Sequence, residues 1–407
     1  MPFRIALSGL NAASSDLGVT GNNIANASTT GFKQSRADFV DVYAVAFQGI
    51  SSTAVGNGVR LAQVEQQFSQ GNIDFTDNSL DLAINGQGFF ITNSQNGAVS
   101  YTRNGAFHID RDGYVVNAGG SRMQMFPAVN NGASFSTGTL SDLQLSLANG
   151  QPQVTSNVTV GLNLPAAETP PSVAVFDPTN PLSYTNSTST TIYDTLGGSH
   201  LASLYYVKDA AVNTWDTYAY IDGNFVDGPD QLIFNNTGNL VTPASGQITA
   251  PAYTPGNGAA DITLTMDYST ATQYGAPFGV NSLSQDGFSA GRLSGIDIDT
   301  NGVVFARFTN GQSSPLGKVA LANFPNPQGL RQLGDTSWDE TFAAGDLLVG
   351  EAGTASFGLL QSGALEASNV ELTEQLVQLI TSQRNFQANA QTLSTADTIT
   401  QTIINIR

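Results

Sequence analysis

The N-terminal segment carries apolar side chains at seven-residue intervals. Large residues form one row, and a small residue follows three positions after each of them. This is the pattern of an α-helix whose apolar stripe packs against a second helix. Its glycines each weaken a helix by about 1 kcal/mol relative to alanine, so we expect the segment to need a partner. The large row is Phe3, Leu10, Leu17 and Ile24, and the small row is Ala6, Ala13, Thr20 and Ala27.

The C-terminal segment has the same seven-residue spacing. The range Ala364 to Arg407 contains no glycine or proline, and Ser368 to Glu371 has the pattern of a capping box. We predict a helix of roughly 40 residues and about 60 Å, which favours a bundle. Packing against the chain's own sheet is the alternative. One row is Leu365, Leu372, Leu379, Phe386 and Leu393; the complementary row is Leu376, Ala390 and Ile404, interrupted by Gln383 and Asp397.

Short strands and turns are predicted between the two ends. The segment Asp261 to Tyr268 alternates polar and apolar residues, which is typical of a strand with one buried face. Leu201 to Val207 and Thr214 to Ile221 are expected to pair as a hairpin. Three further hairpin turns are predicted at Asp112-Gly113, Asn301-Gly302 and Asn310-Gly311. The predicted fold class is mainly β with long terminal α-helices, in nested and discontinuous domains.

Composition shifts place the expected domain boundaries. Asn149 to Pro171 is loose and contains prolines, and Ala271 to Ser289 is rich in glycine, serine and glutamine. If the terminal helices pair, the chain must run outwards and return, so the domains are nested. We expect a terminal helical coiled-coil domain at 1–33 and 364–407, an extended linker at 34–71, a middle β domain at 72–148 and 287–363, and an inserted outer β domain at 149–286.

Charge and composition exclude several classes of protein. Lys and Arg number 14 against 32 Asp and Glu, for a net charge of −18 without a basic cluster, which argues against nucleic-acid or anionic-membrane binding. The chain has no cysteine, and its histidines are His108 and His200, so thiol chemistry and multi-histidine metal sites are excluded. No apolar run is long enough to span a membrane. The first residues lack a secretory signal pattern, so an extracellular location requires another export route.

Three acidic segments contain the residue types of functional sites, and an ordinary turn is favoured for each. Asp297 to Gly302 begins like a calcium loop, but the twelfth position is Phe308 instead of glutamate. Asp110 to Gly113, beside His108, fits a turn between strands. Asp74, Asp77 and Asp81 lie among Thr, Asn and Ser, as turn residues do. We therefore predict no catalytic, cofactor-binding or metal site, and no enzymatic activity.

Three stretches resemble the axial proteins of the bacterial flagellum, the rod and hook family. Together they cover about a quarter of the chain, in the family's order. Phe386 departs from the pattern, since relatives often have tyrosine there. The stretches are Ser8–Ala13 with Gly21–Asn26 and Thr30–Lys33, then Asn78–Ile84 with Gly86–Phe90, and finally Gly363–Val370 with Gln383–Ala390. In length and in its inserted β region, the chain is similar to the hook subunits of that family.

The resemblance implies a structural subunit that polymerises into a curved, flexible tube, a universal joint carrying torque outside the cell. It implies as partners other copies, the rod, the hook cap, the hook–filament junction and the export apparatus, with no cofactor, nucleic acid or membrane insertion. The terminal helices are expected to be largely disordered in the free monomer and to fold on assembly. The expected assembly interface is Phe3, Leu10, Leu17, Ile24, Leu365, Leu372, Leu376, Leu379, Phe386, Leu393 and Ile404.

Two other classes of structural protein stay open on the sequence. A distal rod subunit or another axial protein shares the same motifs. An extracellular adhesin or carbohydrate-binding module would use aromatic side chains of the inserted region to stack on sugars. Those aromatic residues are Tyr205, Tyr206, Trp215, Tyr218 and Tyr220.

Overall fold

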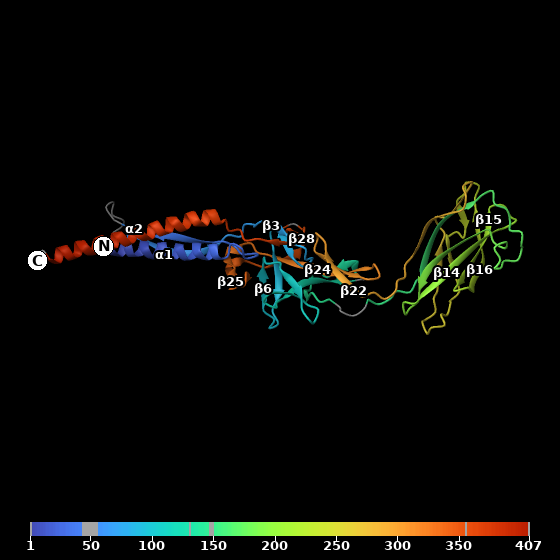
Figure 1. The fold of residues 1–407 in the computed structure, drawn as a ribbon, viewed down its shortest axis with the longest axis horizontal. Coiled ribbons are helices and arrows are strands. Elements are labelled where there is room, and N and C mark those ends of the chain that lie inside the picture. Colours follow the sequence, from blue (N-terminus) through green and yellow to red (C-terminus); the bar gives the residue numbers. More distant parts are fainter. Residues whose placement is uncertain (1, 43–55, 130–131, 146–149, 355, 406–407) are drawn as a thin grey trace. The chain divides into compact units, whose positions relative to one another are not determined.

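The chain forms two compact units, each assembled from separate stretches of sequence. A computed structural model describes residues 2–42, 56–129, 132–145, 150–354 and 356–405 (Figure 1). Unit 1 comprises Met1–Ser146, Gly295–Arg307 and Ser313–Arg407. Unit 2 comprises Leu147–Ser294 and Phe308–Gln312.

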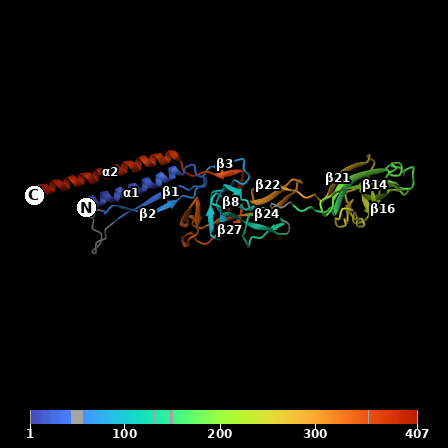
Figure 2. The ribbon, with the colours of Figure 1, turned by 60° about the horizontal axis from the view of Figure 1, so that its bottom comes forward.

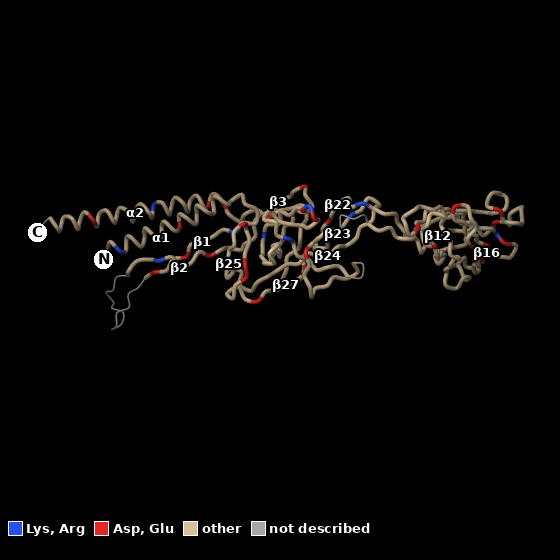
Figure 3. The backbone as a smooth tube through the Cα atoms, turned by 90° about the horizontal axis from the view of Figure 1, so that it is seen from below, with Lys and Arg blue, Asp and Glu red and all other residues tan. Residues whose placement is uncertain are grey.

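Two long helices belong to unit 1. Helix α1 spans Pro2–Ala25 and α2 spans Leu372–Asn405. They lie side by side and run antiparallel, so that the N-terminus and the C-terminus are at the same end of the pair (Figures 1 and 2). Few charges occur along either helix (Figure 3): Arg4 and Asp16 in α1, and Glu374, Arg384 and Asp397 in α2.

A two-stranded antiparallel sheet lies against α1. Its strands are β1, Ser35–Asp41, and β2, Val59–Gln66 (Figure 2). The Ser8 hydroxyl of α1 accepts the backbone N–H of Val59 at 3.2 Å. Part of the predicted extended linker therefore forms a sheet beside the first helix. Residues 43–55 of that linker lie outside the described residues.

The remainder of unit 1, here called the β body, is built on a 13-stranded sheet with two short strand pairs, β4–β28 and β3–β29. Its core includes Phe89, Tyr101, Phe126 and Phe324, all buried around Trp338. The strands are β3 Ile73–Phe75, β4 Leu82–Asn85, β5 Phe89–Asn93, β6 Val99–Thr102, β7 Phe107–Ile109, β8 Val115–Asn117, β9 Arg122–Val129, β10 Ser134–Phe135, β11 Ser141–Asp142, β22 Leu293–Ile298, β23 Val303–Phe308, β24 Ser313–Asn323, β25 Arg331–Gly334, β26 Ser337–Asp339, β27 Leu348–Glu351, β28 Leu359–Ser362 and β29 Ala364–Glu366. Two 3₁₀ turns, η2 Pro327–Gly329 and η3 Phe342–Ala344, follow β24 and β26.

Unit 2 consists of two five-stranded sheets around one apolar core. The first sheet is centred on β12, and the second runs in the order β13-β14-β15-β16-β17. Inward-facing residues of both sheets, among them Val160, Leu162, Leu204 and Trp215, form a single buried cluster. The strands are β12 Asn157–Pro165, β13 Asn186–Tyr193, β14 Ser199–Lys208, β15 Thr214–Ile221, β16 Asn224–Phe234, β17 Leu240–Thr242, β18 Gln247–Thr249, β19 Thr265–Asp267, β20 Thr272–Tyr274 and β21 Gly279–Gln285.

The predicted class, a mainly β chain with a helix at each end, is confirmed. The predicted hairpins are also present: β7–β8 at Gly113, β22–β23 at Gly302, β23–β24 at Gly311, and β14–β15. The three glycines have φ of 84°, 83° and 79°, a left-handed conformation that costs glycine little. The strand predicted over Asp261 to Tyr268 is shorter, since β19 covers Thr265–Asp267, although the apolar alternation does face the core.

The start of the C-terminal helix was predicted wrongly. Helix α2 begins at Leu372, and Ala364 to Glu366 instead form β29, antiparallel to β3. Leu365 is therefore not part of the helical row. The predicted capping box is also absent, because the Ser368 hydroxyl accepts the N–H of Val370 at 3.3 Å before the helix starts. Burial of Ala364 and Glu366 in the β body holds this segment extended, which outweighs its helical pattern.

Candidate functional site: the terminal helix pair and its polar anchor

The contact between α1 and α2, here called the seam, is lined mainly by small and polar residues. Successive seam residues of α1 are alternately three and four positions apart, which is the spacing of a two-helix contact. On α1 they are Ala6, Gly9, Ala13, Asp16, Thr20 and Asn23; on α2 they are Gln375, Leu379, Ser382, Phe386, Asn389 and Leu393.

Polar bonds cross the seam at seven-residue intervals. Asn23 Nδ2 donates to Gln375 Oε1 at 3.0 Å, and both residues are buried. Seven residues earlier on α1, the Asp16 carboxylate accepts a hydrogen bond from the Ser382 hydroxyl and another, at 3.0 Å, from Gln378 Nε2. Each bond forms only when its two residues lie opposite each other along the helix axes. These bonds therefore specify the register of α1 against α2.

The third level of the seam is a close approach at a glycine. A Cβ placed on Gly9 would lie 2.5 Å from Asn389 Oδ1, so the Asn389 side chain fills the space that a larger residue would need. Glycine weakens a helix, and here that cost is offset by close packing of the two helices. By contrast, nothing lies within 4 Å of a Cβ placed on Gly18 or Gly21.

The seam agrees with the predicted rows only in part: Leu379, Phe386 and Leu393 of α2 lie in it, whereas the large row of α1 does not. On α1 the predicted small residues Ala6, Ala13 and Thr20 are buried, but their partners in the seam are Gly9, Asp16 and Asn23. Phe3 is exposed, Leu10, Leu17 and Ile24 are half-buried at the seam's flank, and Ala27 lies beyond the end of α1. On α2 the complementary row is Gln375, Ser382 and Asn389, and Leu376 and Ile404 are exposed.

The rotated seam leaves large apolar side chains on the outer faces of both helices. Leu376 is 49% exposed and Ile380 is 50% exposed, one turn apart on α2. Full burial of one such side chain contributes about 1.5–3 kcal/mol. The exposed apolar residues of the pair are Phe3, Leu7, Leu372, Leu376, Val377, Ile380, Ile399 and Ile404.

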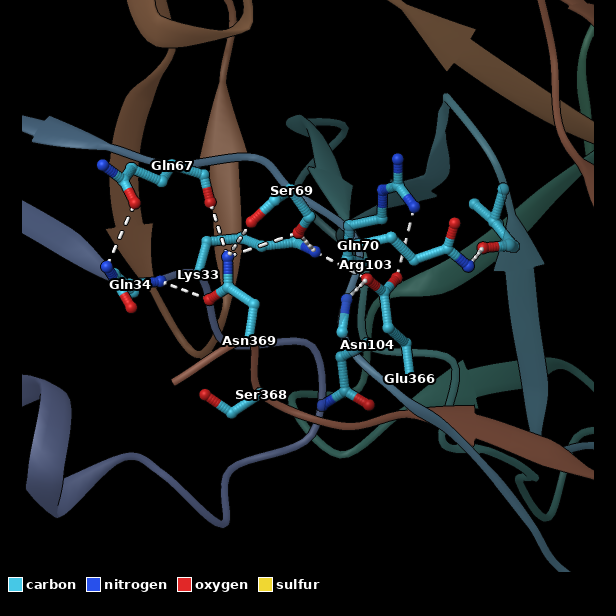
Figure 4. Close-up of polar contacts among 12 residues, drawn as sticks. Lys33, Gln34, Gln67, Ser69, Gln70, Arg103, Asn104, Glu366, Ser368 and Asn369 are labelled. Carbon is cyan, nitrogen blue, oxygen red and sulfur yellow. Dashed lines mark hydrogen bonds and ion pairs between the residues drawn. The ribbon is translucent and has the colours of Figure 1, made fainter. Parts of the chain in front are cut away.

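A buried ionic cluster, the polar anchor, lies where the segments next to the helices meet the β body (Figure 4). Glu366 Oε1 accepts Lys33 Nζ at 2.6 Å, and Glu366 Oε2 accepts Arg103 Nη1 at 3.2 Å. The side chains of Lys33 and Glu366 are 0% exposed and that of Arg103 is 5% exposed. Lys33 Nζ also donates to the Ser69 carbonyl at 2.7 Å, and the Gly71 N–H donates to Glu366 Oε1 at 3.0 Å.

Asn369 extends the anchor to the start of α2 (Figure 4). Its Oδ1 accepts the N–H of Gln34 at 2.7 Å, and its Nδ2 donates to the Gln67 carbonyl at 2.8 Å and to Ser69 Oγ at 2.9 Å. The segment after α1, the segment after β2 and the segment before α2 are thus joined by one side chain. The chain segments that connect α1 and α2 to the β body therefore meet it at the same place.

Burial governs the charges of the anchor. It lowers the pKa of Lys33, and the pairing with Glu366 opposes that shift. Burial likewise lowers the pKa of Arg103, again opposed by Glu366. Because one carboxylate neutralises two buried cations, removing Glu366 would leave both without compensation.

The acidic segments have structural roles. Asp297 pairs with Arg307 across the β22–β23 hairpin. Asp110 Oδ1 accepts the N–H groups of Asp112 and Tyr114 in the β7–β8 turn. Among the described residues, no group of three or more His, Cys, Asp or Glu could hold a metal ion.

Asp74 and Asp81, two of the three aspartates near residue 80, are likewise placed in local structure. The Asp81 carboxylate accepts Thr76 Oγ1 at 2.8 Å and Asn78 Nδ2 at 2.9 Å, and Asp74 lies on β3 opposite Leu365. They therefore stabilise a turn and a strand pair.

The sugar-stacking set is divided between two faces of one sheet. Tyr206 and Trp215 are fully buried in the core of unit 2, so that part of the hypothesis is wrong. Tyr205, Tyr218 and Tyr220 lie on the opposite face, where Phe176 stacks on Tyr218 with ring centroids 4.1 Å apart.

The sequence analysis did not identify the glycine and polar residues of the seam or the residues of the anchor. A signal for the seam was present, since Gly9, Asp16 and Asn23 are seven apart, as are Gln375, Ser382 and Asn389. They were overlooked because apolar periodicity ignores polar residues. The anchor joins Lys33 and Glu366, which are far apart in sequence, so no local pattern indicates it.

Comparison with known families covers both ends and the middle of the chain. Residues 3–33 match the family described as "Flagella basal body rod protein", and residues 361–406 match "Flagellar basal body rod FlgEFG protein C-terminal". Residues 83–163 match "Flagellar hook protein FlgE/F/G D1 domain", and residues 163–288 match "Flagellar basal body protein FlaE D2 domain".

Full-length relatives identify the family. The chain is 37% identical over 415 residues to the flagellar hook protein FlgE of Escherichia coli (strain K12), covering 100% of both chains. This chain belongs to the flagellar hook protein family. The hook protein of Salmonella typhimurium is 36% identical over 417 residues, covering 100% of both, and that of Rhizobium meliloti is 32% identical over 418 residues, covering 100% of this chain and 98% of that one.

A solved structure shares the fold. The crystal structure of Helicobacter pylori flagellar hook protein FlgE2 superposes with a TM-score of 0.52 at 16% identity, covering 72% of this chain and 100% of that chain. Membership of the family makes the chain a structural subunit of the flagellar hook, and the rod alternative is not favoured. Within the described residues, neither α1 nor α2 combines the length and apolar character that crossing a membrane requires.

Proposed function

We propose that copies of this chain join head to tail into an open helical tube that is curved and flexible and transmits torque. A contact between two different faces of the subunit generates such a polymer when the rotation between copies does not close. Bending requires contacts that can shift between packings of nearly equal energy. The scarcity of charge on both helices suits this, because few ion pairs would fix one packing.

The domains have separate roles in the proposed tube. The terminal helical domain, residues 1–33 and 364–407, forms an inner layer of helices. The middle β domain, 72–148 and 287–363, makes contacts between neighbouring subunits, with 34–71 as a linker. The inserted domain, 149–286, is the outer part. Unit 2, which has a core of its own, supports the separation of the inserted domain, whereas the terminal and middle domains together make up unit 1.

One observation carries the proposal: the seam is lined mainly by small and polar residues, and several large apolar side chains of both helices lie outside it. In a single subunit these large apolar side chains are exposed to water, whereas a neighbouring copy would bury them. They include Phe3, Leu372, Leu376 and Ile380. The proposed assembly interface retains Phe3, Leu10, Leu17, Ile24, Leu372, Leu376, Leu379, Phe386, Leu393 and Ile404, together with Leu365 on β29.

In the free monomer the helix pair is marginal. Its seam leaves the large apolar residues Leu379, Phe386 and Leu393 only half-buried, and its glycines oppose helix formation. The helices therefore fold fully only when other copies cover their outer faces. An unfolded terminal region also suits passage through the flagellar export apparatus to a site outside the cell.

The other proposed partners are the rod, the hook cap and the hook–filament junction. Each would contact the polymer at an end, where exposed helices and β surfaces lack a neighbour of the same kind. We propose no catalytic role, because the acidic clusters of the described residues are engaged in turns and strand pairs.

The test is polymer formation, viewed by electron microscopy, by chains that differ at one exposed position of α2. Leu376→Glu should abolish tubes, because a charge would have to be buried between copies. The matched control, Gln387→Glu, adds the same charge at an exposed polar position and should still form curved tubes. Tubes of normal shape from Leu376→Glu would overturn the interface.

Two further measurements test assembly-coupled folding. A chain lacking residues 370–407 should keep both β units folded and form no polymer. Hydrogen exchange in dilute monomer should be fast along α1 and α2 and slow in the β body, whereas in the polymer all should be slow. Strongly protected helices in dilute monomer would contradict the proposal.

A further inference from the structure

One histidine of unit 2 lies between two carboxylates. His200 Nδ1 is 2.6 Å from Asp222 Oδ2, and His200 Nε2 is 3.1 Å from Asp194 Oδ2. The side chain of Asp194 is 0% exposed and that of His200 is 11% exposed. A neutral imidazole has one N–H, whereas an imidazolium has two. Only the protonated ring can therefore donate to both carboxylates.

The three side chains tie separate loops of unit 2 together. Asp194 Oδ1 accepts the N–H groups of Leu196 and Gly198, at 2.8 and 2.7 Å, and so shapes the turn between β13 and β14. Asp222 lies in the turn between β15 and β16. Asn257, from the segment after β18, donates to Asp194 Oδ2 at 2.5 Å.

The turn held by Asp194 packs against the segments through which the chain enters and leaves unit 2. A Cβ placed on Gly197 would lie 3.0 Å from Pro152 Cβ and 3.1 Å from Ala290 N. Close by, Gln153 and Phe288 exchange backbone hydrogen bonds, at 3.0 and 2.9 Å. Loosening of the turn would therefore also loosen the two segments through which the chain enters and leaves unit 2.

We propose that His200 is a proton-dependent latch, which in its charged form fastens the Asp194–Gly198 turn to the β15–β16 turn and loses this hold on deprotonation. The charged and titratable groups that face the ring are Asp194 and Asp222, with Tyr253 at 6.2 Å between ring centroids. None of these three groups is a cation, so the protonated ring is the positive partner of both carboxylates. The latch is a property of the single chain and does not depend on the proposed tube.

The charges of the three groups agree with the geometry. Burial by itself lowers the pKa of His200, but hydrogen bonds to Asp222 and Asp194 outweigh burial, so its pKa is raised. Burial opposes ionisation of Asp194, but hydrogen bonds from Asn257, His200 and two backbone N–H groups outweigh it and lower the pKa to about 2. A raised histidine pKa contributes stability that is complete below the ordinary value and disappears as pH rises through the folded value.

NMR of the full chain, labelled at histidine, tests the latch directly. The chain has two histidines, so His108→Gln assigns both signals and is the matched control. We expect His200 to titrate above the ordinary value of about 6.5, and to titrate lower in Asp222→Asn. A His200 signal that titrates at or below the ordinary value overturns the proposal.

Hydrogen exchange, corrected for its intrinsic pH dependence, tests the consequence. Protection of the N–H groups of Leu196 and Gly198 should fall by up to tenfold per pH unit as His200 deprotonates, equally in wild type and His108→Gln. In His200→Gln it should be low at every pH. If that variant does not fold, Asp222→Asn replaces it, and the fall in protection should begin at lower pH. Protection that does not change with pH in the wild type refutes the latch.

Discussion

Replacing Glu366 by glutamine tests the polar anchor. The substitution keeps the shape of the side chain and removes the single negative charge that faces two buried cations, Lys33 and Arg103. The glutamine carbonyl can still accept from Lys33 and from the N–H of Gly71. Its amide group, however, is a donor and would face the Arg103 guanidinium, which is also a donor. Arg103 Nη1 therefore loses its carboxylate acceptor, while Arg103 Nη2 keeps its hydrogen bond to the Gly86 carbonyl at 2.9 Å.

The magnitude follows from burial. Removing one partner of a buried ion pair costs about 3–5 kcal/mol. Burial already lowers the pKa of Lys33 against the opposing effect of Glu366, so in the variant Lys33 can lose its proton and limit the cost. We therefore expect about 3 kcal/mol, a large part of the roughly 5–15 kcal/mol that stabilises a typical domain. This corresponds to a fall in Tm of roughly 6–12 °C for a unit of this size.

The assay is urea unfolding of the full chain, followed by hydrogen exchange at Gly31 and Gly71. The Gly31 N–H donates to the Glu366 carbonyl at 2.8 Å, and the Gly71 N–H donates to its carboxylate. Glu351→Gln is the matched control, because its pair with Lys318 is partly exposed and should contribute less than about 1 kcal/mol. If Glu366→Gln costs no more than this control, the anchor does not stabilise the β body.

Four other changes have expected outcomes. Gly9→Ala should lower the temperature at which tubes dissociate, at a cost of about 1–3 kcal/mol per subunit, because its Cβ would lie 2.5 Å from Asn389 Oδ1; Gly18→Ala, with open space around it, should instead stabilise by about 1 kcal/mol. Asp16→Ala removes the acceptor of two bonds across the seam and should cost the polymer about 1.5 kcal/mol, measured in the same way. The pKa of Asp194 is lowered to about 2, so its contribution to the stability of unit 2 is present above pH 3.8 and disappears as the pH falls towards 2. A near-UV circular dichroism signal that is constant across this pH range would contradict the assignment.

Local chemistry in the sequence determined the secondary structure of most of the chain. Gly302 and Gly311 follow asparagine between apolar runs, and a left-handed φ at those glycines closes the predicted hairpins. The alternation from Asp261 to Tyr268 likewise indicated a segment with one buried face. Such features depend on neighbours within a few residues, so the sequence displays them directly.

The sequence left open which face of each element would be buried. On β14 the sequence is compatible with either Tyr205 or Tyr206 facing inwards, and only the packing of the two sheets of unit 2 placed Tyr206 in the core. On α1 the apolar row suggested a contact through Leu10 and Leu17. The tertiary structure instead placed Gly9 and Asp16 against α2, because close approach and hydrogen bonds to α2 are available there.

The start of α2 and the polar anchor were decided by tertiary structure alone. A helix-forming pattern from Ala364 was overruled because Glu366 meets Lys33 and Arg103 only when segments from three distant parts of the chain come together. An unpaired buried charge costs more than a few turns of helix gain, so the chain adopts the local structure that completes the pairing. Sequence periodicity thus determined which elements form, and long-range burial of polar groups decided where they begin and which sides meet.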